Sequence, residues 1–226
     1  MRKIVLDREA LCARVAEEFA AAAARRPDGA FGFTAVDVPP EALEAIAASG
    51  ADFSKAAAFN ACEYVGPAAE GEASQASKLR KLLYDRTPFA AVHVPAEGID
   101  YDAAIRAAGG LELVLLGVGE RGHVAFCEPG ADFSGNTGVM KLAEVTRRIA
   151  QADFADPGDV PTHGVTMGIG TLLAAKRILL VACGEDKANA AQKTLEGRPE
   201  SFIPASFLQL HTDVTLLLDP DAASRL

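Results

Sequence analysis

The chain has 226 residues, half of them apolar, and carries a formal net charge of −9. This composition supports a large hydrophobic core, whereas the negative charge, which no dense basic run offsets, argues against nucleic acid as a partner. No apolar run reaches the roughly 18–20 residues that span a bilayer, and residues 1–7 lack the long apolar stretch of a secretory signal. We therefore expect a cytoplasmic protein that binds neither nucleic acid nor a membrane.

The amino-terminal half alternates strand-like and helix-like segments. In chain order, we predict a strand at residues 2–6, a helix at 8–25, a strand at 30–36, a helix at 40–49, a strand at 55–65, a helix at 74–84, a strand at 90–94 and a helix at 101–108. The helices carry apolar residues three or four positions apart, whereas the strands are short apolar runs.

The carboxy-terminal half continues this pattern. We predict strands at residues 111–118, 164–168, 177–183 and 214–218, a helix at 187–196, and a surface loop or a lid at the glycine-rich residues 130–138. Alternating strands and helices are typical of a parallel sheet that is covered on both faces. We therefore predict an α/β fold, a single three-layer Rossmann-like domain over residues 1–226 whose mostly parallel central sheet is flanked by helices.

The four cysteines are widely spaced and form no CxxC pair; they are Cys12, Cys62, Cys127 and Cys183. Such spacing is typical of reduced thiols rather than of a disulfide framework or a zinc site. The sequence therefore predicts no bound metal.

Ionisable residues follow the predicted strand at 111–118. Ligands of open parallel sheets bind beyond the carboxyl ends of the strands, and this strand runs into a glycine-rich turn that carries Glu120, Arg121 and His123, with Glu128 five residues further on. A histidine held near a carboxylate can exchange protons near neutral pH. The turn is thus a candidate active site, the alternative being a glycine turn with surface charges.

Residues 117–129 resemble a signature of the glucosamine-6-phosphate deaminase family, Gly-x-Gly-x-Asp-Gly-His-Ile-Ala-Phe-Asn-Glu-Pro. Residues 59–66, 165–173 and 206–211 resemble further family stretches in the same order, and Lys187 resembles the lysine at one of the family's helix starts. By these ordered motifs the chain is identified as a member of the superfamily. The related 6-phosphogluconolactonases share the Gly-His core but lack the Ala-Phe-x-Glu-Pro continuation.

The resemblance implies aldose–ketose isomerisation coupled to loss of ammonia, a reaction that needs no redox cofactor. In that reaction His123 would open the sugar ring as an acid/base, Glu128 would orient it, and Lys187 would bind phosphate. The family's tendency to oligomerise also predicts a homo-oligomer.

Several family residues are replaced in this chain. Cys62 stands where the family has the aspartate that shuttles a proton, and Arg121 stands where it has an aspartate two residues before the histidine. The family's glycine/threonine phosphate loop corresponds to residues 32–39, where Asp37 adds a negative charge that would repel phosphate. Its phosphate-binding arginine has no clear counterpart, although Arg147 or Arg148 could take that place.

We therefore expect an enzyme with altered acid/base chemistry of isomerase or deaminase type, acting on an amino sugar, its phosphate or a related polyol. The predicted catalytic residues are His123, Glu128 and Cys62, and the predicted substrate-binding residues are Arg121, Glu120, Glu63, Gly117, Gly119 and Lys187. His123 and Cys62 are expected to face one pocket.

A structural role is the alternative for four of these residues. Cys62 could be a small core residue, Glu63 a structural cap, Glu120 a solvated turn residue and Lys187 a solvated side chain beside its helix. For the whole chain, the alternatives are a 6-phosphogluconolactonase-like hydrolase, in which His123 activates water, and a non-catalytic sugar-binding protein of the same fold.

Overall fold

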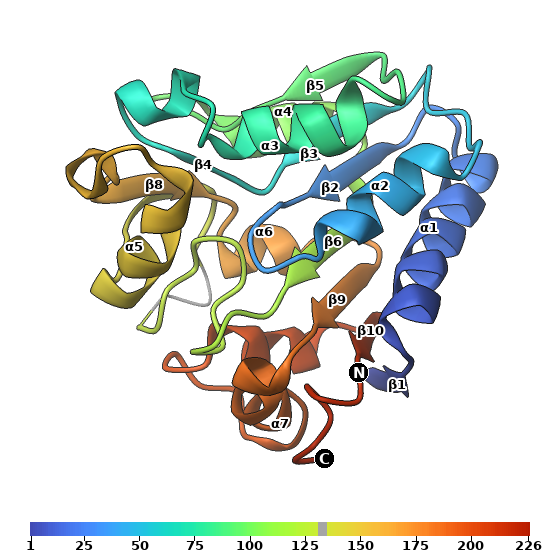
Figure 1. The fold of residues 1–226 in the computed structure, drawn as a ribbon. Helices are drawn as coiled ribbons and strands as arrows, with labels where there is room; N and C mark the ends of the chain where they lie inside the picture. Colours follow the sequence, from blue (N-terminus) through green and yellow to red (C-terminus); the bar gives the residue numbers. More distant parts are fainter. Residues whose placement is uncertain (131–134) are drawn as a thin grey trace.

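Seven strands form the central sheet of the computed structural model, which describes residues 1–130 and 135–226 (Figure 1). From one edge to the other they are β1 (Arg2–Val5), β10 (Val214–Leu218), β9 (Ile178–Ala182), β6 (Leu111–Gly117), β2 (Ala30–Phe33), β3 (Ala57–Asn60) and β5 (Ala91–His93). Every neighbouring pair is parallel. The predicted parallel sheet is confirmed. Residues 131–134 of the predicted loop or lid lie outside the described part of the chain.

The side chains of β6 show how both faces of this sheet are covered. Leu113 and Leu115 pack in one cluster with residues of α1 (Arg8–Arg25) and α2 (Pro40–Ala48). The alternate residues Val114 and Leu116 pack in a second cluster on the opposite face. That cluster includes residues of α4 (Tyr101–Ala107), α6 (Ile169–Leu173) and α7 (Ala188–Glu196). A strand buried on both faces reads as a continuous apolar run, which explains the pattern of the segment. The three-layer α/β fold is confirmed.

Local sequence signals set several helix boundaries. The Asp7 side chain accepts a hydrogen bond of 2.8 Å from the backbone N–H of Ala10 and so caps α1. Ser74 caps α3 (Gln75–Leu79) in the same way, with 3.0 Å between its Oγ and the Ser77 nitrogen. A π-helical turn over Arg80–Tyr84 extends α3, so the helix predicted at 74–84 is present but changes its winding halfway.

The prediction of a single strand at residues 55–65 is wrong, because the chain passes from one sheet to another within this segment. Residues Ala57–Asn60 form β3 of the central sheet, whereas β4 (Cys62–Tyr64) belongs to a second sheet with β8 (His163–Thr166) and β7 (Gly138–Lys141). β8 lies between the other two and pairs antiparallel with each. One continuous apolar run carries no signal for such a crossing, which requires knowledge of the strand partners.

The remaining described elements are short. They are α5 (Glu144–Ala150), which sequence patterns did not predict, and 3₁₀ turns at Pro67–Glu70, Gln151–Asp153, Pro157–Asp159, Glu185–Lys187 and Pro204–Leu210. Among the described residues, no helix combines the length and the apolar character needed to span a membrane.

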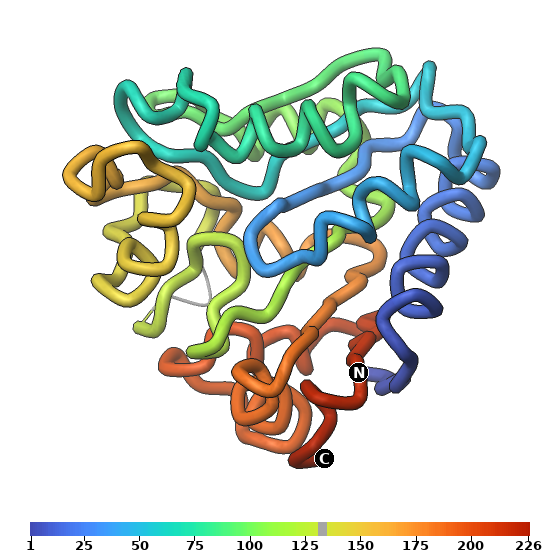
Figure 2. Tube along the Cα trace, in the orientation of Figure 1, coloured from blue at the N-terminus to red at the C-terminus, as the bar shows by residue number. Residues whose placement is uncertain are grey.

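The order of the strands creates a crevice between β2 and β6. From β2 the chain moves outward through β3 to β5, whereas from β6 it moves the opposite way through β9 to β10. The segments that follow β2 and β6 therefore begin next to each other at the carboxyl edge of the sheet but lead to strands on opposite sides. This edge is the usual ligand position in open α/β folds. Figure 2 shows these two segments side by side.

Candidate active site

Three ionisable side chains meet at this crevice, each from the segment that follows a different strand. Asp37 follows β2, His123 follows β6 and Lys187 follows β9. His123 Nε2 lies 2.8 Å from Asp37 Oδ2, and Lys187 Nζ lies 2.9 Å from Asp37 Oδ1. All three side chains are largely buried, with exposed fractions of 6% for His123, 16% for Asp37 and 13% for Lys187. Asp37 thus links two residues that the sequence analysis had assigned to catalysis and to substrate binding.

Gly117 and Gly119 permit this close approach. A Cβ atom at Gly117 would lie 2.3 Å from the carbonyl carbon and oxygen of Asp37, and one at Gly119 would lie 1.9 Å from His123 Cε1. Asp37 itself has a φ of 55°, in the left-handed region that aspartate and asparagine tolerate better than most residues. The two glycines therefore let the loop and the imidazole ring pack against the end of β6.

The charges at the crevice stabilise each other. Burial alone would raise the pKa of Asp37, but the hydrogen bond and charge of His123, together with the Lys187 ammonium, lower it to about 2. Burial alone would lower the pKa of Lys187, but the carboxylates of Asp37 and Asp186 raise it above its usual value. Asp37 is therefore a carboxylate and accepts the hydrogen bond that His123 Nε2 donates.

A cavity of about 160 Å³ opens beside His123 and Asp37. Lys78 and Asp153 also line it and form an ion pair with 2.5 Å between Nζ and Oδ2. The other lining residues combine an apolar surface with a few uncharged polar groups; they are Ala35, Val36, Phe126, Ile149, Ala150, Tyr64, Gln75 and Thr146. Apolar walls with a few convergent polar groups are characteristic of small-molecule sites.

Two of the predicted catalytic residues each have a buried side-chain atom without a partner in the described part of the chain. Glu128 Oε1 accepts a hydrogen bond of 3.1 Å from the Ala143 nitrogen. Its Oε2 atom and His123 Nδ1 are buried and have no hydrogen-bond partner among the described residues. Buried polar atoms are normally satisfied, so a ligand or a water molecule is the expected partner of these two.

Glu63 is engaged in the fold. Its carboxylate accepts hydrogen bonds from the backbone N–H groups of Tyr64, Gln75 and Ala76, at 2.7, 3.1 and 2.7 Å. Burial raises the pKa of the Glu63 carboxyl, and these three donors oppose part of that change. The geometry is that of a carboxylate fastening the start of α3 to β4.

Cys62 is a buried thiol beside Thr34, with 3.7 Å between Sγ and Oγ1. Burial raises the pKa of this thiol far above its usual range, so the group is protonated at neutral pH. Cys62 is absent from the lining of the cavity beside His123. The shared pocket of the two side chains stays a prediction.

The predicted arginines and Glu120 form no hydrogen bond or ion pair with His123, Asp37 or Lys187 among the described residues. Glu120 and Arg121 are exposed and form no hydrogen bond or ion pair with any residue that the structure describes. Arg147 donates hydrogen bonds of 3.1 Å to the carbonyl oxygens of Pro161 and Val160. Among the described residues, no group of three or more histidine, cysteine, aspartate or glutamate side chains could hold a metal ion.

Asp37, Lys78 and Asp153 are site residues that sequence reasoning did not assign. Asp37 was noticed only as a negative charge in the loop, and its 86-residue separation from His123 hides their contact. Lys78 and Asp153 carried no sequence signal, because their positions depend on α3 and on the turn after α5.

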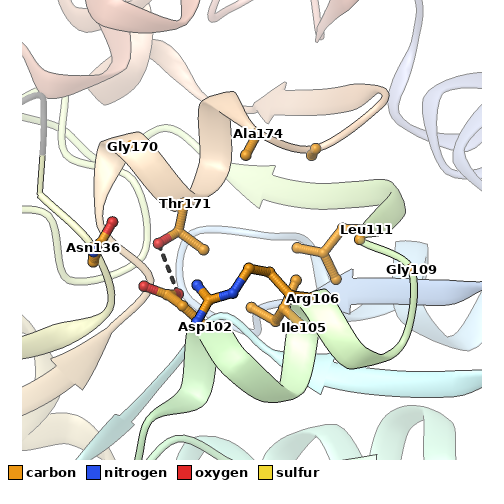
Figure 3. A pocket seen from close by; sticks show the side chains of 11 residues that line it. Asp102, Ile105, Arg106, Gly109, Leu111, Asn136, Gly170, Thr171 and Ala174 are labelled. Carbon is orange, nitrogen blue, oxygen red and sulfur yellow. Dashed lines mark hydrogen bonds between the residues drawn. The ribbon is translucent and has the colours of Figure 1, made fainter.

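A larger cavity of about 450 Å³ lies between α4 and α6 (Figure 3). Asp102 points into it and accepts hydrogen bonds from the hydroxyls of Thr171 and Thr137, at 2.9 and 2.6 Å. None of the predicted site residues lines this cavity. The crevice with His123 therefore remains the candidate active site.

The fold and the crevice define a class of protein. It is an α/β protein with a histidine–carboxylate pair in the crevice between two parallel strands whose connections run in opposite directions. The model of the family described as glucosamine-6-phosphate isomerases/6-phosphogluconolactonase matches residues 7–217, and the chain belongs to this family. The membership inferred from the sequence motifs is confirmed.

Several relatives are named glucosamine-6-phosphate deaminase. The protein of Latilactobacillus sakei is 40% identical over 204 residues, covering 87% of this chain and 86% of the relative. The protein of Rhodopirellula baltica is 38% identical over 238 residues, covering 99% and 95%.

Solved structures agree with this placement. A structure described as a monomeric glucosamine-6-phosphate deaminase superposes with a TM-score of 0.93 at 30% identity, covering 100% of both chains. The 6-phosphogluconolactonase of Trypanosoma brucei has a TM-score of 0.78 at 17% identity, covering 100% of this chain and 98% of the other, which shows a common fold.

Proposed function

We propose that this chain is an enzyme that performs acid/base chemistry of the isomerase or deaminase type on an amino sugar. His123 is the group that moves the proton, and Asp37 is the positioning carboxylate. The observation that carries the proposal is the 2.8 Å contact between His123 Nε2 and Asp37 Oδ2, which lies beside a cavity at the crevice between β2 and β6. The names of the relatives support the substrate class.

Opening of a sugar ring is the step that this pair suits best. The hemiacetal hydroxyl loses its proton, the bond between C1 and the ring oxygen breaks as the C1 carbonyl forms, and the ring oxygen gains a proton. One histidine can accept the first proton and return it to the ring oxygen, so no net proton is consumed. Asp37 stabilises the imidazolium that exists between the two transfers, because its carboxylate accepts from Nε2.

Glu128 and Cys62 complete the proposed catalytic set in supporting roles. Glu128 offers a buried carboxylate oxygen that is not used by the fold. Cys62 is a protonated thiol, so its contribution is that of a hydrogen-bond donor rather than a base.

A comparison of two histidine variants tests the proposal. Wild-type protein, His123→Gln and the control His163→Gln are assayed for ammonia release, ketose formation and lactone hydrolysis, with free and 6-phosphorylated glucosamine and gluconolactone. The His163 side chain is exposed, and among the described residues its ring hydrogen-bonds only to the neighbouring Thr162 hydroxyl, so it is a matched control. We expect His123→Gln to lose roughly 10²–10⁴-fold in turnover and His163→Gln to retain it.

Two results would contradict the proposal. Sugar binding without turnover of any substrate would make the chain a non-catalytic sugar-binding protein. Hydrolysis of lactones alone would make it a lactonase in which His123 activates water.

A further inference from the structure

The ammonium group of Lys187 is already neutralised by the protein. Its Nζ atom lies 2.9 Å from Asp37 Oδ1 and 2.9 Å from Asp186 Oδ2. The Lys187 side chain is only 13% exposed, so water screens these contacts weakly. A cation in this position would otherwise be an obvious partner for an anionic group of a ligand.

The lysine that lines the cavity is paired as well. Lys78 is bound to Asp153 on the cavity wall. Arg147, one of the two arginines considered from the sequence as a phosphate ligand, donates its guanidinium hydrogens to two backbone carbonyls instead. Asp37 and Asp153 therefore place two carboxylates at the cavity, and both lysines beside them are already matched by negative charge.

A phosphate ester would meet two obstacles here. To reach Lys187 it would have to displace Asp37, whose other oxygen is held by His123 Nε2. If Asp37 stayed in place, its carboxylate would repel the phosphate at close range in a poorly solvated crevice. A sugar without phosphate meets neither obstacle.

We propose that Asp37 occupies the anion-binding position at Lys187, so that the site selects an amino sugar without a phosphate group. The inference rests on the proposed function, because it names the substrate class of the same crevice. Asp37 then has two roles, one for each oxygen. Its Oδ2 atom positions His123, and its Oδ1 atom pairs with the Lys187 ammonium that would otherwise bind a phosphate.

The size of the cavity is consistent with a small ligand. Its volume of about 160 Å³ is below the roughly 300–1,000 Å³ of common ligand pockets. A single unphosphorylated monosaccharide demands less room and less rearrangement than its phosphate ester does.

The experiment measures ligand binding by calorimetry at neutral pH and constant ionic strength. Glucosamine, glucosamine 6-phosphate and inorganic phosphate are titrated into wild type, Asp37→Asn and Asp186→Asn. Asparagine keeps the shape of Asp37 and tolerates its left-handed backbone. Asp186→Asn is the matched control, since it removes the other carboxylate at Lys187 but does not touch His123.

We expect wild type to bind glucosamine at least about tenfold more tightly than glucosamine 6-phosphate. We expect Asp37→Asn to gain at least about tenfold in affinity for inorganic phosphate, and Asp186→Asn to gain much less. If Asp37→Asn does not fold, the preference of the wild-type protein between the two sugars decides the matter without it.

The outcomes separate this inference from the proposed function. Tighter binding of glucosamine 6-phosphate to wild type, with turnover that is lost in His123→Gln, would overturn the inference and leave the proposed function standing. Displacement of Asp37 by phosphate, seen as equal phosphate affinity in wild type and Asp37→Asn, would overturn it too. Failure of every sugar to bind would overturn both.

Discussion

The carboxylate of Asp37 lies 2.8 Å from the Nε2 atom of His123, although the two residues are 86 positions apart in the chain. Their contact follows from the pairing of β2 with β6, which brings the segments after these strands together. The other oxygen of the same carboxylate contacts Lys187, which follows β9. One side chain therefore couples three neighbouring strands of the sheet at their carboxyl ends.

The lowered pKa of Asp37 predicts a pH-dependent contribution to stability. Its folded-state value of about 2 lies below the ordinary value of 3.8, so the carboxylate stabilises the fold above about pH 4, and that contribution disappears as the pH falls through about 2. A difference of this size corresponds to about 2 kcal/mol. We expect Asp37→Asn to be less stable than wild type by about that amount at neutral pH.

Urea unfolding of wild type and Asp37→Asn at several pH values measures this contribution. The difference in unfolding free energy should shrink steadily below about pH 4. A difference that stays constant from neutral pH into the acid range would contradict the ionised, paired state of Asp37.

Gly119→Ala should disturb the imidazole ring directly. The added Cβ would lie 1.9 Å from His123 Cε1, so the ring must move away from its present contact with Asp37. Displacement of a catalytic group by about 1 Å can cost about 10²-fold in rate, and we expect a turnover loss of that order. Gly71→Ala is the control, because Gly71 has a compatible φ and its Cβ would meet only the Ala68 oxygen at 3.5 Å.

Circular dichroism and turnover assays on both glycine variants check this prediction. Both proteins should fold, and only Gly119→Ala should lose activity. Full turnover in Gly119→Ala would show that the present position of His123 is not the catalytic one.

The elements best predicted from the sequence are those with strong local signals. α1 begins at Arg8 and ends at Arg25 as predicted, because its apolar periodicity is long and Asp7 caps it. The strand before His123 was also located to within a residue, since a run buried on both faces is unbroken. The glycine-rich turn after it carries His123, which lies 2.8 Å from Asp37 in the crevice; its catalytic role stays a prediction.

What the sequence could not provide is which distant segments meet. The partnership of His123 with Asp37 depends on the order of the strands, which short-range patterns do not contain. The same holds for the crossing at Ala61, whose N–H donates to the Phe33 oxygen while its own oxygen accepts from Met167. The second sheet, with β7 and β8, therefore went unpredicted as a unit.

Glu63→Gln should weaken the fold more than it changes ligand selectivity. Both oxygens of Glu63 accept backbone hydrogen bonds, and a glutamine amide nitrogen cannot accept from any of those three donors. At least one buried N–H would lose its partner, which costs roughly 1–3 kcal/mol.

Two measurements on the same Glu63→Gln preparation separate a role in the fold from a role in substrate binding. They are thermal unfolding and the preference between free and phosphorylated glucosamine. A lower melting temperature with unchanged preference is the expected result. An unchanged melting temperature with a changed preference would instead make Glu63 a substrate ligand.

The state of Cys62 can be tested by its reactivity. Alkylation requires a thiolate, and burial raises the pKa of this thiol while also shielding it from the reagent. We expect iodoacetamide at pH 8 to leave Cys62 unmodified in the folded protein and to modify it rapidly in urea, with peptide mass spectrometry as the readout. The half-buried Cys183, whose pKa burial raises to about 12, should react slowly in the folded state and serves as the internal comparison.

Cys62→Ala completes this test by separating chemistry from packing. Because the thiol does not line the cavity beside His123, the variant should keep turnover to within about tenfold while losing roughly 1–2 kcal/mol of stability with the contact to Thr34. Rapid labelling of Cys62 in the folded protein, together with a loss of turnover as large as that of His123→Gln, would show that the thiolate is the proton carrier. That result would require surroundings in solution that differ from the present ones, in which burial keeps the thiol protonated.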